Sequence, residues 1–158
     1  MKSRGAKAVL AGVCVLIAVA GAWAFQRAQQ GAVVERGNRL FHGEVAMPAR
    51  IVGHTMVLPA TVSRCMNCHE TRSSAVSAAA SAVAGGQAGR YGPALDQNTL
   101  TQLLARRGGP PSRYDAAALC TLLRTGIDPA QVMIPQTMPR YGVDGADCDA
   151  LWGYLVTR

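Results

Sequence analysis

The sequence predicts a mostly α-helical protein with three main helices and long loops. Apolar residues recur at helical spacing in three places, within residues 33–41, 115–126 and 144–155. Prolines and glycines interrupt the chain between them, and no two segments show the alternating pattern of a paired strand. At 158 residues, the chain suits one domain with a leader and is too short for two ordinary domains.

Residues 1–26 are predicted to form an apolar helix that directs export. Lys2, Arg4 and Lys7 precede an uncharged run over residues 8–25, which is typical of a basic n-region followed by an apolar h-region. Two interpretations compete. A signal peptide could be cut at the A-x-A-like residues 22–24, or the run, about 27 Å long as a helix, could remain as a membrane anchor. Both place the rest of the chain in the periplasm, on the exported side of the inner membrane.

A linker over residues 27–32 is expected to lead into a domain at residues 33–158. The first helix of that domain has about ten residues and an apolar face formed by Val33, Gly37, Leu40 and Phe41. Residues 44–64 hold two prolines and no sustained period, so they predict a loop. Residues 73–89 are rich in Ala, Ser and Gly and predict a small helix or a flexible insertion.

Two capped helices complete the predicted domain. Ser112 or Asp115 can cap a helix that ends at Gly126. The last helix has the clearer pattern, because Asp144 and Asp147 stand at capping-box spacing. Its apolar residues stand at i, i+3, i+4 and i+7: Cys148, Leu151, Trp152 and Leu155.

Composition leaves two questions about the core. Hydrophobic residues make up 49% of the chain but aromatic residues only 5%, and aromatic rings supply much of a small core's buried area. The five cysteines are an odd number, so at least one has no disulfide partner within the chain. The cations after Lys7 are all scattered arginines, and the chain is exported, so a nucleic-acid partner is not expected.

The chemistry is concentrated in the string Cys65-Met66-Asn67-Cys68-His69. C-x-x-C-H is the attachment signature of a c-type haem. Two cysteines three residues apart project to the same side, so both sulfurs can form thioethers along one porphyrin edge, and the adjacent His69 can ligate the iron. Chance occurrence, a thioredoxin-like site and a zinc site are the alternatives, but no βαβ setting is visible and His42 and His54 are irregularly placed.

From these residues the chain resembles the class I c-type cytochromes, the mono-haem cytochrome c family, over most of residues 33–157. The resemblance implies a cytochrome c-like fold around one covalently bound haem c. It also implies contact between the first helix, at Gly37 and Phe41, and the last, at Leu151 and Tyr154.

The same resemblance matches residues 92–95 to the family's Gly-Pro-x-Leu segment, in which the Pro93 carbonyl would accept a hydrogen bond from His69. A simple turn is the other interpretation of Pro93. Met138, before Pro139 and ahead of the last helix, matches the family's axial methionine. The resemblance therefore assigns His69 and Met138 to the iron. His54 or His42 stays open as an alternative sixth ligand, and Met133, Met47 and Met56 are expected to fill the core instead.

Cys120 and Cys148 lie among the apolar positions of two successive predicted helices. Because the chain is exported, a disulfide between them is expected over two buried free thiols. The remaining cysteine, Cys14, is interpreted as an apolar residue of the N-terminal helix.

The function expected is single-electron transfer between redox protein partners such as a dehydrogenase, an oxidase or another cytochrome, without catalysis by the chain itself. Arg64, Arg72 and Arg140 are candidates to surround the haem edge or pair with its propionates. Two alternatives stay open. One is a haem enzyme or gas sensor with a labile sixth ligand, and the other is a subunit of a larger oxidoreductase complex.

Overall fold

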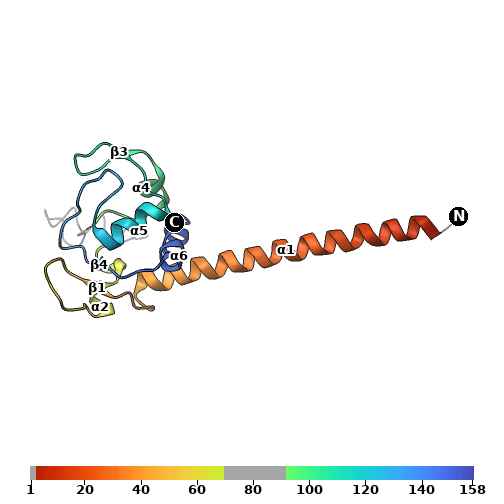
Figure 1. Cartoon of the computed structure of the whole chain (residues 1–158), viewed down its shortest axis with the longest axis horizontal. Coiled ribbons are helices and arrows are strands. Elements are labelled where there is room, and N and C mark those ends of the chain that lie inside the picture. Colours follow the sequence, from red (N-terminus) through yellow and green to blue (C-terminus); the bar gives the residue numbers. More distant parts are fainter. Residues whose placement is uncertain (1–2, 70–91) are drawn as a thin grey trace, which may run out of the picture. The chain divides into compact units, whose positions relative to one another are not determined.

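The computed structural model describes residues 3–69 and 92–158, with side chains described from residue 16 onward. It divides the chain into two compact units, residues 1–33 and residues 34–158. The described part is mostly helical with little sheet, as the sequence predicts (Figure 1). The predicted insertion at 73–89 lies outside the described residues.

Helix α1, Ser3–His42, is a single helix of 40 residues. The linker predicted over residues 27–32 is helical instead, because Arg, Ala and Gln are good helix formers and one glycine does not end a helix. Among the described residues, no helix is long and apolar enough to cross a membrane. The side chains of residues 8–15, which begin the predicted apolar run, are not among those described.

The end of α1 packs against the last helix, α6, Gly145–Leu155. A Cβ atom on Gly37 would lie 1.9 Å from the carbonyl oxygen of Ala150, so only glycine lets the two backbones approach this closely. Next to this contact the rings of Phe41 and Tyr154 lie 5.6 Å apart. The buried face is narrower than predicted, because Val33 is 44% exposed.

The structure selects Asp115 over Ser112 as the first cap and confirms Asp144 as the second. Asp115 accepts a hydrogen bond from the Ala118 N–H at the start of α5, Ala116–Thr125, and Gly126 ends that helix at φ 79°. Asp144 caps α6 through the Asp147 N–H at 2.7 Å. The Asp147 carboxylate accepts from Arg36 of α1, which ties the two helices together at their polar edge.

Short elements fill the loops between the long helices. Two antiparallel pairs of two-residue strands are present, although the sequence predicted none, because strands this short show no alternation. The pairs are β1, Ala49–Arg50, with β4, Arg140–Tyr141, and β2, Leu104–Ala105, with β3, Pro111–Ser112. The remaining elements are α2, Ala60–Ser63, the 3₁₀ helix η1, Cys65–Asn67, and α4, Gln97–Thr101.

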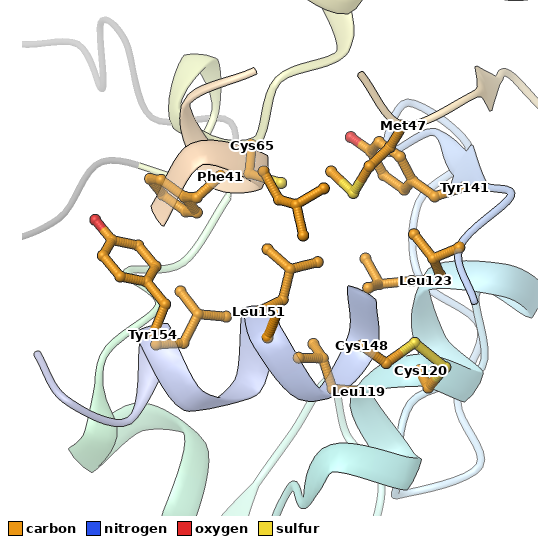
Figure 2. Close-up of a cluster of buried hydrophobic side chains, with 14 of the residues drawn as sticks. Phe41, Met47, Cys65, Leu119, Cys120, Leu123, Tyr141, Cys148, Leu151 and Tyr154 are labelled. Atoms are coloured by element: carbon orange, nitrogen blue, oxygen red, sulfur yellow. A yellow bond between two sulfur atoms is a disulfide. The ribbon is translucent and has the colours of Figure 1, made fainter. Parts of the chain in front are cut away.

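The core lies where α1, α5 and α6 meet (Figure 2). Its most buried large side chains are mainly aliphatic, as the low aromatic content requires: Phe41, Leu40, Leu100, Leu151 and Leu155. Met47 is 6% exposed and belongs to this core. Met56 and Met133 are 72% and 64% exposed, so their assignment as core residues was wrong. Their hydrophobicity was a poor guide to burial, because both methionines stand in irregular segments that have no buried face.

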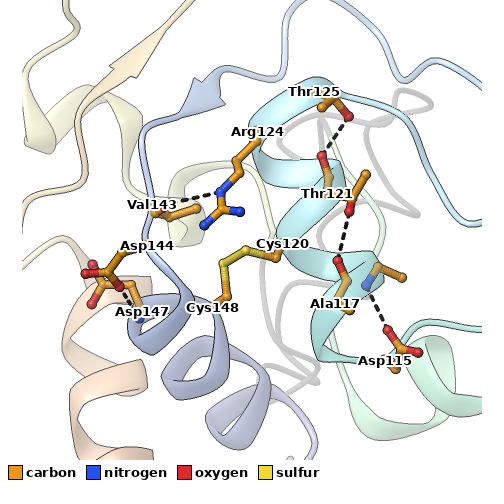
Figure 3. Close-up of a disulfide and its surroundings, with 11 residues drawn as sticks. Asp115, Ala117, Cys120, Thr121, Arg124, Thr125, Val143, Asp144, Asp147 and Cys148 are labelled. Atoms are coloured by element: carbon orange, nitrogen blue, oxygen red, sulfur yellow. Dashed lines mark hydrogen bonds between the residues drawn. A yellow bond between two sulfur atoms is a disulfide. The ribbon is translucent and has the colours of Figure 1, made fainter.

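Cys120 of α5 and Cys148 of α6 form the expected disulfide (Figure 3). Beside it, the Arg124 Nε–H donates to the carbonyl of Val143 at 2.9 Å. The bridge holds α6 against α5, and the hydrogen bond holds the segment before α6 against the same helix.

Removing the disulfide should destabilise the protein substantially. Changing both Cys120 and Cys148 to Ala should lower the free energy of unfolding by about 3–4 kcal/mol, because the bridge closes a loop of sequence separation 28. Denaturant titration of the oxidised full chain measures this loss. The single change Cys120→Ala should cost about as much as the double change, since either opens the loop. Two independent, additive losses would contradict a bond between these residues.

The contact of α1 with α6 predicts opposite effects for two glycines. Gly37→Ala should lower the free energy of unfolding by about 1–3 kcal/mol, since the new Cβ overlaps the Ala150 carbonyl. Gly31→Ala is the matched control, because it lies in the same helix with nothing within 4 Å of its Cβ position. It should leave stability unchanged or raise it by up to about 1 kcal/mol. Thermal denaturation followed by circular dichroism compares the two, and equal effects would contradict the packing described.

Candidate functional site

A cavity of about 330 Å³ opens within residues 34–158. Its walls are mostly apolar and come from α5, α6, the end of α1 and the loops that precede the helices. Leucines form much of the wall, among them Leu119, Leu123, Leu151 and Leu155. A cavity of this size and character, with a few polar groups, is typical of a cofactor or small-molecule site.

His69 lines this cavity and is held in place by Gly92 and Pro93. Its ring is 8% exposed, and its Nδ1–H donates to the carbonyl oxygen of Pro93 at 2.8 Å. A carbonyl can only accept, so Nδ1 carries the proton and Nε2 keeps a free lone pair when the ring is neutral. Gly92 lies against the same ring, because a Cβ there would be 2.3 Å from Cε1. His69 is therefore oriented as a metal-ligating histidine would be.

Burial favours the neutral form of this imidazole. Desolvation lowers the pKa of His69 below its usual value, the hydrogen bond to Pro93 partly opposes this, and the charge of Arg107 lowers the pKa further. A neutral imidazole is the form that coordinates a metal ion.

Cys65 and Cys68 flank the turn of η1, just before His69. The amide groups of Cys68 and His69 both donate to the carbonyl of Cys65, at 3.1 and 2.9 Å, so the three residues form one compact turn. Cys65 is buried and lines the cavity, whereas Cys68 is half-buried, and the two thiols are not joined to each other. Burial raises the pKa of the Cys65 thiol to about 12. Such a thiol is a poor nucleophile at neutral pH, unlike the attacking thiol of a thioredoxin-like site.

Met138 lines the same cavity as His69. It is half-buried, packs against the core, and comes at the end of a turn in which its N–H donates to the carbonyl of Pro135 at 3.2 Å. The alternative ligands His42 and His54 do not line the cavity. The Nδ1–H of His42 donates to the carbonyl of Asn38 at 2.9 Å, and His54 lies exposed in the loop before α2. His69 and Met138 are 69 residues apart in the sequence, and the fold brings both to one cavity.

Four polar residues at the cavity could not be picked out from the sequence: Arg106, Arg107, Tyr114 and Asp128. Arg106 lies over the Tyr114 ring at 4.9 Å and donates to the carbonyls of Thr99 and Ser112. The two arginines precede the glycines of the turn that joins β2 to β3, and the sequence predicted this turn but gave no sign that the arginines beside it line a cavity. Asp128 is 2% exposed, and one of its carboxylate oxygens has no hydrogen-bond partner among the described residues.

Of the three arginines expected to surround the site, Arg64 and Arg140 are among the described residues. Arg64 is exposed and donates to the side chain of Asn67, and Arg140 donates to the carbonyl of Met138. Neither lines the cavity, and Arg72 lies outside the described residues. Closeness to the C-x-x-C-H motif or to Met138 in the sequence therefore did not indicate which arginines line the cavity.

Comparison with known proteins gives no family assignment: no protein-family model, no curated protein and no solved structure matches the chain. Among the described side chains, those of residues 16–69 and 92–158, no three His, Cys, Asp or Glu are grouped so that they could hold a metal ion.

The packing of Gly92 against the imidazole predicts a local effect on His69. Gly92→Ala should displace the ring, break its hydrogen bond to Pro93 and lower the free energy of unfolding by about 1–3 kcal/mol. NMR of the imidazole nitrogens reports the tautomer, and denaturant titration reports stability. Gly142→Ala is the control, because its Cβ would meet only Pro48, at 3.7 Å. An unchanged His69 signal in Gly92→Ala would contradict the contact.

Proposed function

We propose that this protein is a single-electron carrier with one covalently attached haem c, ligated by His69 and Met138. The observation that carries the proposal is one juxtaposition: the C-x-x-C-H motif supplies Cys65 and His69 to a cavity that Met138 also lines. The juxtaposition supports a place among the mono-haem c-type cytochromes that the motifs of the chain resemble.

The residues present fit such a group. The porphyrin ring of a haem supplies four ligands to the iron. The protein needs to supply only two more, so one imidazole and one thioether suffice. The imidazole has its Nδ1 committed to Pro93, which leaves Nε2 for the iron. The apolar leucine walls suit the porphyrin faces, while Arg106 and Arg107 offer cations at the cavity for its carboxylates.

When bound, the haem supplies an iron that passes between the ferrous and ferric states. The chain's own residues hold and tune it. Cys65 and Cys68 would hold the group through thioethers, the Pro93 carbonyl fixes the orientation of His69, and the buried leucines exclude water. A thioether ligand such as Met138 favours ferrous iron compared with a second imidazole. The proposed role is therefore electron transfer without a substrate site, because His69 and Met138 would both be committed to holding the iron.

The setting of this activity is proposed from the N-terminal segment. Its basic residues and apolar run favour export, so the domain would work in the periplasm or on the exported side of the inner membrane, either released or anchored by residues 8–25. Its partners would be other redox proteins, such as a dehydrogenase, an oxidase or another cytochrome.

Absorption spectroscopy of the intact protein tests the proposal. The ferric protein should show the weak sulfur-to-iron charge-transfer band at the red end of its spectrum, and mass spectrometry should show one haem retained after denaturation. Met138→Ala should abolish the band and let the ferrous protein bind carbon monoxide rapidly, because the sixth position opens. Met133→Ala is the matched control, since Met133 is exposed and does not line the cavity.

Three results would contradict parts of the proposal. Absence of covalent haem would overturn it entirely. A wild-type protein that already binds carbon monoxide rapidly would favour a gas sensor or haem enzyme. Retention of the charge-transfer band in Met138→Ala would assign the sixth ligand to another residue.

A further inference from the structure

Arg140 lies beside the loop that presents Met138 to the cavity. It stands in β4, opposite Arg50 of β1, so its backbone is fixed by the strand pair (Figure 1). The next two residues strengthen this anchor. The Tyr141 hydroxyl donates to the carbonyl of Ser63 at 2.6 Å, and the Gly142 N–H donates to the carbonyl of Pro48 at 2.7 Å. The backbone that carries Arg140 is thus held on a part of the fold that does not include the Met138 loop.

The guanidinium of Arg140 turns back onto that loop. Its Nη1–H donates to the carbonyl of Met138 at 2.5 Å and its Nη2–H to the carbonyl of Ile134 at 3.4 Å. These two carbonyls bracket the turn around Pro135. Because the guanidinium is planar and forked, one side chain can bridge both ends of this turn, which an ammonium group cannot do in the same way.

Gly126 provides the space that the guanidinium occupies. A Cβ on Gly126 would lie 2.2 Å from Cζ, Nε and Nη2 of Arg140. The Nε of Arg140 is buried and has no hydrogen-bond partner among the described residues. Placing the guanidinium beside Gly126 removes part of it from water, which costs free energy. The hydrogen bonds to the two carbonyls offset this cost. The Ile134 N–H also donates to the Gly126 carbonyl at 2.8 Å, which places the start of the loop at the same point.

We infer that Arg140 is a positioning residue: it clamps residues 134–138 so that the Met138 thioether stays at the cavity and on the iron. This inference rests on the proposed function, because it requires Met138 to be the sixth ligand. Arg140 itself does not line the cavity, so it acts only through the Met138 loop whose backbone it contacts.

Loss of the clamp would leave the sixth position open. The chain has no lysine after Lys7, so no lysine amine in the domain could take the place of Met138. A sixth position vacated by Met138 would be accessible to water or to an added ligand. The apparent affinity for such a ligand is set by the fraction of protein in which Met138 is detached.

The test uses the full-length haem protein in three variants. In Arg140→Gln, the ferric charge-transfer band should weaken and the affinity for added imidazole should rise about tenfold, as expected for loss of a charge-assisted hydrogen bond. Arg140→Lys keeps the charge without the fork and should fall between this variant and wild type. Arg50→Gln removes the same charge from the exposed register partner and should match wild type in both measurements.

The outcomes separate this inference from the proposed function. If wild type itself lacks the band, the His69/Met138 ligation is wrong and the inference falls with it. If wild type shows the band and Arg140→Gln keeps both the band and the wild-type imidazole affinity, only the inference is overturned. Should Arg140→Gln fail to accumulate, Arg140→Lys decides: a weakened band supports the bridge, and an unchanged band and affinity overturn it.

Discussion

The approach of α1 to α6 at Gly37 is the constraint on which the rest of the domain depends. Without a side chain at Gly37, the backbone of α1 can lie directly against the carbonyl of Ala150, and the rings of Phe41 and Tyr154 then pack beside the contact. This fixes the rotation of α6 about its axis. Leu151 and Leu155, one and five positions after Ala150, consequently face the cavity together with Phe41.

Three connections then join the cavity walls to α6 and the segment just before it. The disulfide between Cys120 and Cys148 holds α5 against α6, and the Arg124 side chain holds the carbonyl of Val143. The Tyr141 hydroxyl reaches the carbonyl of Ser63, two residues before Cys65, and so connects the segment ahead of α6 to the C-x-x-C-H turn. Because Met138 stands just before this segment, the hydrogen bond helps to keep the C-x-x-C-H turn and the Met138 loop at one cavity.

The cavity has a mostly apolar wall and a few polar groups, of which His69 and Asp128 are buried. Burial favours a neutral His69, as a metal ligand requires, by lowering its pKa. Desolvation and the charge of Asp128 raise the pKa of the Tyr114 hydroxyl, so that it also remains neutral. The fixed charges in the lining are supplied by Arg106, Arg107 and Asp128. The core that surrounds the cavity is mainly aliphatic, in keeping with the low aromatic content of the chain.

The sequence by itself determined what depends on local spacing. The caps at Asp115 and Asp144, the helix end at Gly126 and the C-x-x-C-H turn are all set by neighbouring residues, and each could be predicted. The pairing of Cys120 with Cys148 was also within reach, since both lie on predicted helices and the N-terminal segment has the pattern of an export signal. Only the tertiary structure decided which arginines turn toward the cavity, that Met56 and Met133 lie in solvent, and that Arg140 bridges the Met138 loop. These outcomes depend on contacts between segments far apart in the chain, and local spacing carries no information about them.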